Sequence, residues 1–407
     1  MTDMKKGSTS AKAQAGKWEI KKLGDVCEFK SGITIDSKLE KSGGEVIYAK
    51  VGDMNLEGNE DYITLSSRYV DFKNINQNQI IPVGSIIFPK RGGAIATNKK
   101  RRIVRPTIVD LNTMALVPSN AIDKDYLFFW FQQIDLSDLS NGTSIPQINN
   151  YSFDDIHISF PKSLPEQQRI VAILDKAFAA IAKAKANAEQ NLKNAKELFE
   201  SYLQEVFEKK GEGWEEKTLG EVCNVIGGGT PSKANIIFYD GDIYWATVRD
   251  MKGEIIKDTE HKITKEAVKN SSTNIIPKGN VIIATRVGLG KVCLIENDTA
   301  INQDLRGIVP INPKKLSVDF LFRWFKANAF KIVEEGTGAT VQGVKLPFIK
   351  SLKINLPLLN TQQAIVKKLD ALSTETKKLE FIYQQKIADL DEMKKSILQK
   401  AFSGELK

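Results

Sequence analysis

The stretch WEIKKLGDVC (Trp18–Cys27) decides the fold, because it returns almost unchanged as WEEKTLGEVC (Trp214–Cys223). Further matches follow in the same order, with YAKVGDM (Tyr48–Met54) answered by WATVRDM (Trp245–Met251). A repeat this long exceeds any solenoid unit and indicates that a whole composite unit was duplicated. A chain built of two matched halves is suited to a partner that itself has two sites.

The composition indicates a globular protein with an anionic partner. The 407 residues are 42% hydrophobic, which is enough for more than one domain with its own core. The net charge of +8 favours nucleic acid as a partner. No apolar run is long enough to span a membrane. Three cysteines fit a reducing compartment, so we expect a cytoplasmic protein in which Cys27 and Cys223 are small core residues.

Each half begins with a mixed domain, and the predicted class is α+β. Short β-type runs bounded by turn residues predict strands at 45–51, 84–88 and 156–160, and an acid precedes an apolar helix at 125–133. The predicted organisation is an arm or tag without order at 1–16, a first domain at 17–163, a long helix at 164–210, a second domain at 211–359 and a second long helix at 360–407.

The two long helices carry a heptad pattern. Their apolar residues recur at steps of three and four, with Lys185 as a polar exception in the first helix. We predict that the helices pair as an antiparallel coiled coil, which would fix the spacing and orientation of the two domains about an approximate two-fold axis. The alternative is that each helix folds back on its own domain. The predicted interface residues are Val171, Leu174, Phe178, Ile181, Leu192, Phe199, Ile365, Leu369, Leu372, Leu379, Leu390 and Ile397.

Motifs for catalysis are missing from the sequence. His157 and His261 have no partners at metal-ligand spacing, and we expect His157 to face solvent from a strand. The run GGGTPSK (Gly227–Lys233) lacks the ending of a Walker loop, so we interpret it as a flexible loop in which a phosphate contact stays open. No dinucleotide fingerprint follows a strand. The sequence therefore predicts no catalytic residue, no metal site and no bound cofactor.

Basic residues follow a predicted strand in the first half. An arginine at the tip of a strand–loop–strand can match the O6/N7 edge of guanine, and we assign this role to Arg91. The run Lys99–Arg102 is expected on phosphates, and the alternative is a solvated charge run. The candidate DNA-binding residues of the first half are Lys90, Arg91, Asn98, Lys99, Lys100, Arg101, Arg102 and Arg105.

The second half has fewer cations at the matching place. Arg286 is followed two residues later by glycine, as Arg91 is, and the other residues of the two loops differ. If both loops contact bases, the two domains recognise different sequences. The candidates of the second half are Lys233, Arg249, Arg286 and Lys291. Two further loops, 141–147 and 338–343, are either contacts to phosphates or adenine edges or plain turns.

These motifs together resemble the specificity subunit of Type I restriction–modification systems. The resemblance covers the chain from Trp18 onward. It rests on the repeated entry stretch, on a repeated Asp-aromatic-Leu-Phe helix, on a strand ending in proline before a Gln-Gln helix start, and on similar helix ends. The matching segments are Asp125–Phe131 and Asp319–Phe325, Pro161 with Gln167 and Pro357 with Gln362, and Ser201–Phe207 and Ser396–Phe402.

The resemblance implies that each globular domain is a target recognition domain that recognises half of a bipartite DNA sequence. It implies that the coiled coil sets the unrecognised spacer and docks two methyltransferase subunits, which use S-adenosylmethionine. A restriction motor-nuclease subunit that uses ATP and Mg²⁺ is a further implied partner, and this chain itself is implied to be non-catalytic. Two other hypotheses stay open: a stand-alone modification or cleavage enzyme, and a coiled-coil scaffold that binds only proteins.

Overall fold

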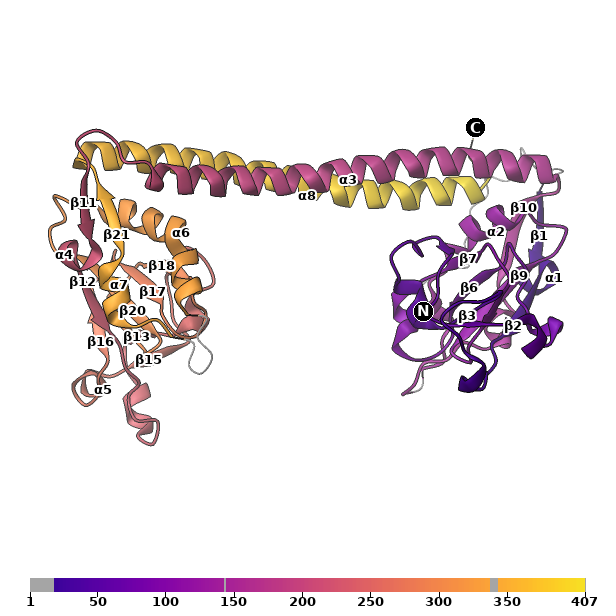
Figure 1. Ribbon diagram of the computed structural model, residues 1–407, viewed down its shortest axis with the longest axis horizontal. Coiled ribbons are helices and arrows are strands. Elements are labelled where there is room, and N and C mark those ends of the chain that lie inside the picture. Colours follow the sequence, from indigo (N-terminus) through magenta and orange to yellow (C-terminus); the bar gives the residue numbers. More distant parts are fainter. Residues whose placement is uncertain (1–17, 143, 337–342, 407) are drawn as a thin grey trace. The chain divides into compact units, whose positions relative to one another are not determined.

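The chain divides into two compact units in the computed structural model, which describes residues 18–142, 144–336 and 343–406 (Figure 1). The first unit comprises Met1–Asn187 with Lys386–Lys407, and the second comprises Ala188–Gln385. Two long helices, α3 (Leu164–Glu208) and α8 (Leu359–Phe402), contribute residues to both units. The arm predicted at 1–16 and most of the loop at 338–343 lie outside the described residues.

The first unit is built on a five-stranded sheet of order β2-β9-β6-β7-β4, a three-stranded sheet of order β5-β3-β8 and the pair β1-β10. The predicted strands are present as β3, β6 and β10, with ends shifted by one to two residues. The elements are β1 (Trp18–Lys22), α1 (Leu23–Val26), β2 (Cys27–Ser31), β3 (Val46–Ala49), β4 (Tyr62–Ile63), β5 (Tyr69–Val70), β6 (Ile86–Pro89), β7 (Arg101–Ile103), β8 (Thr107–Val109), β9 (Thr113–Pro118), α2 (Lys124–Phe131) and β10 (His157–Pro161).

The second unit repeats this plan. Its sheets have the orders β12-β20-β17-β18-β14, β15-β13-β19-β16 and β11-β21. The elements are β11 (Glu215–Thr218), α4 (Leu219–Val222), β12 (Cys223–Gly227), β13 (Ile243–Ala246), β14 (Ile255–Ile256), β15 (His261–Ile263), α5 (Lys265–Lys269), β16 (Asn274–Ile276), β17 (Val281–Ala284), β18 (Val292–Ile295), β19 (Thr299–Ile301), β20 (Leu305–Pro310), α6 (Val318–Glu335), α7 (Leu346–Ser351) and β21 (Lys353–Leu356).

The repeated entry stretch forms the same substructure in both units. It supplies a strand paired with the strand that precedes a long helix, so that β1 pairs antiparallel with β10 and β11 with β21. Cys27 and Cys223 are buried free thiols in the cores, as predicted, and burial raises the pKa of each to about 12. Because a thiol is nucleophilic only as the thiolate, these cysteines act as packing residues.

Helix α2 shows how the sequence directs local structure. Its N-cap is Asp123, two residues before the predicted start, and the Asp123 carboxylate accepts hydrogen bonds from the N–H groups of Asp125 (2.9 Å) and Tyr126 (3.0 Å). Six consecutive side chains, Tyr126–Phe131, are buried. A helix buried on all sides belongs inside a core, and α2 lies between the main sheet of its unit and the long helices.

A buried glutamine joins each long helix to its domain. Gln167 accepts a hydrogen bond from Asp123 N (2.7 Å) and donates to the carbonyl oxygen of Pro161 (2.8 Å). Gln362 accepts from Ser317 N (2.9 Å) and donates to the carbonyl oxygens of Lys315 (2.7 Å) and Pro357 (2.9 Å). The first glutamine of each Gln-Gln pair therefore ties the N-terminus of the long helix to the last strand and the core helix.

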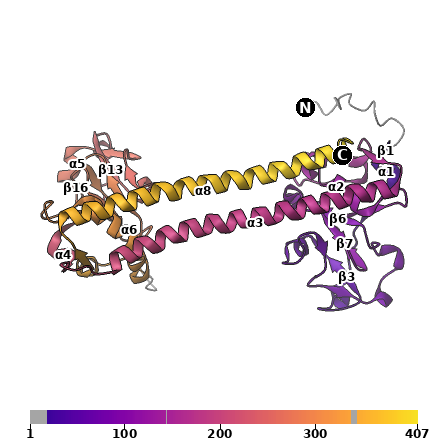
Figure 2. The same cartoon turned by 90° about the horizontal axis from the view of Figure 1, so that it is seen from above.

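The two long helices run antiparallel in each unit (Figure 2). In the first unit, the Lys185 Nζ lies 2.7 Å from the Asp391 carboxylate, and the Lys394 ammonium lies over the Phe178 ring. In the second unit, Lys196 pairs with Glu380 at 3.9 Å. The predicted antiparallel coiled coil is confirmed, and the polar exception at Lys185 has an acidic partner. The helices also pack on the domain cores, through residues such as Ile170 and Leu203.

The predicted seam of α3 faces inward, and one of the six predicted interface residues of α8, Leu379, is wrong. Five of the predicted residues are buried or half-buried, namely Ile365, Leu369, Leu372, Leu390 and Ile397. Ser373, Glu380 and Ile387 are also buried or half-buried, and Glu380 directly follows the predicted Leu379. Leu379 is 44% exposed and is therefore a corrected assignment.

The physical reason for this error is that polar and small residues occupy inward positions of α8. Buried Ser373 and Thr376 line the same cavity as Phe199 of α3, where small side chains leave room for an aromatic ring. Glu380 faces inward because Lys196 neutralises its charge. Hydrophobicity alone therefore selects the neighbouring leucine instead of the residue at the contact.

None of the helices in the described ranges is long and apolar enough to cross a membrane.

Candidate nucleic-acid interface

The second unit has an open cleft of about 840 Å³ where several loops meet at one end of its strands. The loops follow β12, β13, β17 and β19, and the start of β15 completes the wall. The cleft therefore collects segments that are far apart in the sequence. Its lining includes Thr230, Lys233, Tyr239, Trp245, Thr247, Arg249, His261, Gln303 and Asp304.

Two of the four cations predicted in the second half line this cleft. Lys233 comes from the glycine-rich loop, and Arg249 comes from the short 3-10 helix η10 (Val248–Asp250). Arg249 is exposed, and its guanidinium lies 3.8 Å from the Glu260 carboxylate. A solvent-exposed pair of this kind is weak, so the guanidinium is available for a ligand.

Arg286 lies at the rim of the cleft, directly after β17. Its Nε lies 3.7 Å from Asp304 Oδ1, and its side chain remains 48% exposed. Gly288, in the same loop, has a φ of +67°, and a Cβ there would lie 2.7 Å from the side chain of Val248. The glycine lets the Arg286 loop pack against η10, which brings Arg286 and Arg249 to one edge of the domain.

Lys291 does not belong to this cleft. It lines a separate cavity of about 510 Å³ together with Lys252 and Lys326. The turn through Gly288 and Gly290, both with positive φ, reverses the chain before Lys291 and sends it to another face. Grouping Lys291 with Arg286 was therefore wrong, because the turn between them places the two residues on different faces of the domain.

The glycine-rich loop is close-packed, which corrects its interpretation as a flexible loop. A Cβ on Gly228 would lie 2.2 Å from the carbonyl oxygen of Asn302, and a Cβ on Gly229 would lie 2.2 Å from Ser272 Oγ. Glycine at these positions allows backbone to approach backbone. Gly32 plays the same part in the first unit, where its Cβ would overlap the carbonyl oxygen of Asp110.

The first unit places Arg91 at the position of Arg286. Arg91 follows β6 and Arg286 follows β17. These strands pair with equivalent neighbours: β6 pairs with β9, with Ile86 opposite Leu116, and β17 pairs with β20, with Val281 opposite Ile308. Arg91 is exposed, and its guanidinium lies 3.5 Å from Gln147 Oε1. Both predicted base-contacting arginines thus stand at the same edge of their domains.

Lys90 joins three loops of that edge. Its Nζ donates to Ser31 Oγ (3.0 Å), and its backbone N–H donates to the carbonyl oxygen of Asn112 (2.8 Å). Burial lowers the pKa of Lys90, and the neighbouring charge of Arg91 lowers it further. Lys90 is therefore a positioning residue for the loop that carries Arg91.

The run 98–102 is largely structural, which corrects the prediction of a phosphate-binding run. Lys100 is only 2% exposed; its Nζ donates to Asn98 Oδ1 (2.8 Å) and to the carbonyl oxygen of Ile134 (2.7 Å). Arg102 is buried, pairs with Asp125 at 2.7 Å and stacks on Tyr62 and Phe128. These two cations stabilise the core side of β7 and cannot reach a ligand.

The remaining cations of the run are also engaged within the protein. Lys99 bonds to the Asn55 side chain, and half-buried Arg101 donates to the carbonyl oxygens of Lys100 (3.0 Å) and Met54 (3.1 Å). Asn98 adopts a left-handed conformation and accepts the hydrogen bond from Lys100.

Arg105 does not join Arg91 either. It donates to the carbonyl oxygen of Gly44 at the opposite end of β7. The predicted cluster of cations is therefore not one surface.

Strand pairing brings in residues that the motifs did not indicate. Trp245 pairs with His261 across β13 and β15, and Tyr48 N donates to the carbonyl oxygen of Arg68 at the equivalent place in the first unit. His261 lines the cleft with Trp245, whereas Arg68 lies beside the turn after β3. Their signal in the sequence is the repeat itself, which aligns Tyr48 with Trp245, but the partner across the strand is visible only in the fold. His157, by contrast, is exposed on its strand, as predicted.

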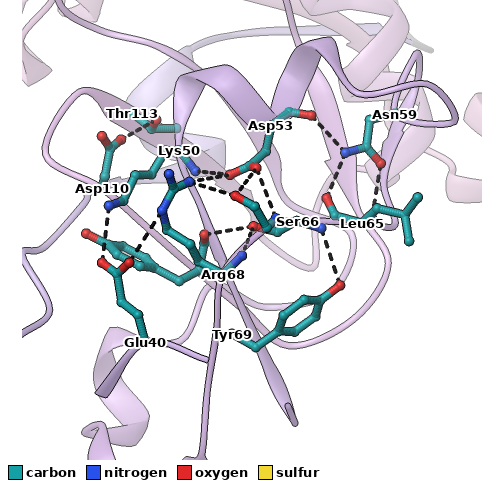
Figure 3. Close-up of polar contacts among 12 residues, drawn as sticks. Glu40, Lys50, Asp53, Asn59, Leu65, Ser66, Arg68, Tyr69, Asp110 and Thr113 are labelled. Carbon is teal, nitrogen blue, oxygen red and sulfur yellow. Dashed lines mark hydrogen bonds and ion pairs between the residues drawn. The ribbon is translucent and has the colours of Figure 1, made fainter. Parts of the chain in front are cut away.

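A repeated aspartate fixes the turn after β3 and β13. Asp53 is buried and accepts a hydrogen bond from Lys50 N (2.7 Å), and Asp250 accepts one from Thr247 N at the same distance. Figure 3 shows Asp53 between Lys50 and the segment that carries Ser66 and Arg68. The aspartate in the Asp-Met ending of both repeat motifs therefore stabilises a turn, and this turn carries Lys50 in one domain and Arg249 in the other.

The crossover loops use the same turn with acid and amide exchanged. Asp110 Oδ1 accepts a hydrogen bond from Asn112 N (3.2 Å), and Asn302 Oδ1 accepts one from Asp304 N (3.1 Å). The backbone geometry is preserved, but the carboxylate stands at the first position in one unit and at the third in the other. The third position in the second unit lies against Arg286, so the two edges differ in charge where their arginines stand.

Nearby Arg306 also shapes the edge of the second unit and was not predicted. Its Nη1 donates to the carbonyl oxygens of Gln303 (3.1 Å) and Leu305 (2.8 Å). Burial, and then the charge of Arg286, lower its pKa. It holds the loop that places Gln303 in the cleft. Within the described residues, no group of histidine, cysteine and acidic side chains is arranged to hold a metal ion.

Two copies of a known domain coincide with the two halves. The Type I restriction modification DNA specificity domain matches residues 15–193 and 211–388, so the chain belongs to this family. It is 35% identical over 263 residues to the Type I restriction enzyme EcoR124I/EcoR124II specificity subunit of Escherichia coli, a match that covers 62% of this chain and 63% of that relative.

Other similarities extend over nearly the whole chain. The Type I restriction enzyme MjaIX specificity subunit of Methanocaldococcus jannaschii is 24% identical over 425 residues, covering 96% of this chain and 94% of that one. A solved structure from work on complex assembly and conformational transition of the type I R-M system superposes with a TM-score of 0.75 at 20% identity, covering 96% of this chain and 99% of that one. The fold of two similar domains with two long helices is therefore a family fold.

Proposed function

We propose that this chain is the non-catalytic DNA sequence-recognition subunit of a Type I restriction–modification complex. Each globular domain contacts one half of a bipartite DNA target in the major groove. Arg91 and Arg286 are the principal candidates for base contacts, because an exposed guanidinium matches the O6/N7 edge of guanine. The single observation that carries the proposal is the equivalence of these two exposed arginines in duplicated domains.

The two edges differ in chemistry, and this supports different half-sites. The second domain offers an aromatic wall of Tyr239, Trp245 and His261, with ring centroids 5.8–6.4 Å apart. At the equivalent strand positions, the first domain keeps an aromatic ring, Tyr48, in place of Trp245 but has Arg68, paired with Glu40, in place of His261. Gln303 adds an amide of the kind that pairs with adenine N6 and N7. An asymmetric target follows from these differences.

The paired helices have two parts in this proposal: they set the number of unrecognised base pairs between the half-sites, and they dock two methyltransferase subunits. Exposed apolar residues on the paired helices of the second unit, Leu198, Phe381 and Ile382, support docking of a protein partner. The methyltransferase subunits bring S-adenosylmethionine, and an added restriction subunit brings ATP and Mg²⁺. This chain binds none of these cofactors, and we place the complex in the cytoplasm.

The test is to map methylated DNA in cells that carry the gene with its methyltransferase, and in cells from which only this gene is deleted. A bipartite methylated motif should disappear with the gene. If every methylated motif persists, the recognition role is wrong. Methyl transfer by the purified chain alone would support the stand-alone enzyme instead, and a complex that shows no salt-dependent DNA binding would support the protein-binding scaffold.

A further inference from the structure

A carboxylate sits between two cations at the edge of the first domain. Lys50 Nζ lies 3.2 Å from Glu40 Oε1, and Arg68 Nε lies 3.4 Å from Glu40 Oε2 (Figure 3). Glu40 thus uses one oxygen for each cation. All three side chains are partly exposed, so the cluster is open to a ligand from solvent.

Both cations are positioned independently of Glu40. The Lys50 backbone is held by Asp53, and the Arg68 guanidinium donates to Ser67 Oγ (2.9 Å) and lies 4.0 Å from the Asp53 carboxylate. Glu40 comes from a different segment, directly after the 3-10 helix η2 (Ser37–Leu39) on the connection between β2 and β3. Removing the carboxylate therefore leaves the scaffold of the two cations in place.

The repeat indicates that this position faces a ligand. Lys50 and Arg68 correspond to Thr247 and His261 by the repeated motif and by strand register. In the second domain, those two residues line the open cleft. The first domain therefore carries two cations where the second domain presents an alcohol and an imidazole to the cleft.

We propose that Lys50 and Arg68 form a seat for a phosphate of the DNA backbone, and that Glu40 occupies this seat in the free protein. The inference rests on the proposed function. A carboxylate and a phosphate present similar pairs of oxygens to a guanidinium, and both pair with an ammonium. DNA exchanges its phosphate for the Glu40 carboxylate, which then moves into solvent. The seat contributes to binding of every sequence, because a phosphate contact carries no sequence information.

The experiment measures duplex binding by the full chain co-purified with its methyltransferase subunits at several salt concentrations. The duplexes are one that carries the mapped motif and one of unrelated sequence. Glu40→Gln removes the competing charge and should tighten binding of both duplexes by about three- to tenfold, because Glu40 then no longer offsets the charges of Lys50 and Arg68. Glu28→Gln is the matched control, since Glu28 is 66% exposed on β2 and its loss changes the net charge equally. Its effect should stay under about twofold.

One further variant separates the seat from a change in folding. Lys50→Met in the Glu40→Gln background should abolish the gain at an unchanged melting temperature. The inference is overturned if Glu40→Gln binds no better than Glu28→Gln, or if its gain is confined to the motif duplex. If the wild-type complex binds neither duplex above a charge-matched background, the proposed function itself is wrong.

Discussion

At the scale of single residues, burial separates cations that hold the fold from cations that can contact DNA. Lys100 and Arg102 lie in a basic run, yet both are buried and bonded, whereas Arg91 and Arg286 are exposed. The sequence could not distinguish them, because alternation along β7 and the aromatic partners from α2 decide which side chains turn inward. The density of positive charge therefore led to the exposed Arg91, but it also included buried cations that cannot contact DNA.

Lys100 gives a pH-dependent prediction. Burial lowers its pKa to about 8, with Asp135 opposing the shift. The unfolded chain then holds more protons than the folded chain between pH 8 and the ordinary lysine pKa. The free energy of unfolding of the wild type should consequently rise over this range, by on the order of 3 kcal/mol relative to Lys100→Met.

Urea denaturation at pH 7, 8.5 and 10 measures this difference. Lys99→Met is the control, because Lys99 is only half-buried. Parallel pH profiles for the wild type and Lys100→Met would contradict the burial argument.

The exposed arginines give a prediction of specificity. Arg91→Ala and Arg286→Ala should each relax recognition at one base pair of one half-site, at a cost of about 1–3 kcal/mol, while the other half-site stays intact. Methylation mapping in cells reads both half-sites at once. Lys291→Ala should leave the motif unchanged, because Lys291 lies outside the cleft. A variant that relaxes both half-sites equally would contradict the assignment of one domain to each.

At the scale of elements, the repeated motifs make the contacts that hold neighbouring elements of each unit together. The Gln-Gln helix start, the Asp-Met turn and the entry stretch each form the same contacts in both units. The sequence predicted the elements because local patterns set them. It predicted the contacts of α8 only in part, because Ser373 and Glu380 face inward through pairing with α3, which a pattern of apolar residues cannot show.

Gln167 gives a prediction of stability. Gln167→Leu leaves the N–H of Asp123 and the carbonyl oxygen of Pro161 buried without a partner. The free energy of unfolding should fall by about 2–3 kcal/mol, and Gln362→Leu should act alike. Gln168→Leu, at the exposed neighbouring position, should change it by less than about 0.5 kcal/mol. Equal melting temperatures of the Gln167 and Gln168 variants would show that the joint is dispensable.

The exposed apolar face of α8 gives a prediction of assembly. Phe381 and Ile382 are 68% and 54% exposed. The double change Phe381→Ser with Ile382→Ser should weaken association with the methyltransferase by roughly tenfold or more, if these residues form the centre of that interface. Size-exclusion chromatography of the co-expressed subunits measures it. Met393→Ser is an exposed apolar control on the same helix, and equal losses from both variants would assign no special role to this face.

At the scale of the whole molecule, the duplication predicts that the length of the paired helices sets the length of the DNA spacer. Four residues added to α3 after Asn191 and four to α8 after Gln384 should lengthen the paired helices by about 6 Å. The spacer of the methylated motif should grow by about one to two base pairs, while both half-sites stay the same. Sequencing of the methylated motif decides this. A spacer of unchanged length would separate the helices from any part in spacing.

The glutamine joint also determines where this protein can be cut and recombined. The first turns of α3, with Gln167, Ile170 and Leu174, belong to the core of the domain that precedes them, and α8 begins in the same way with Gln362 and Leu369. In a hybrid of two relatives that is joined near Ser163, where the domain seems to end, these side chains would face the core of a different domain. If the two sequences are instead joined inside the helix, beyond Leu174, each recognition domain is transferred together with the first turns of the helix that pack on it. Exchange of specificity between relatives should therefore succeed with this junction and fail with one a few residues earlier.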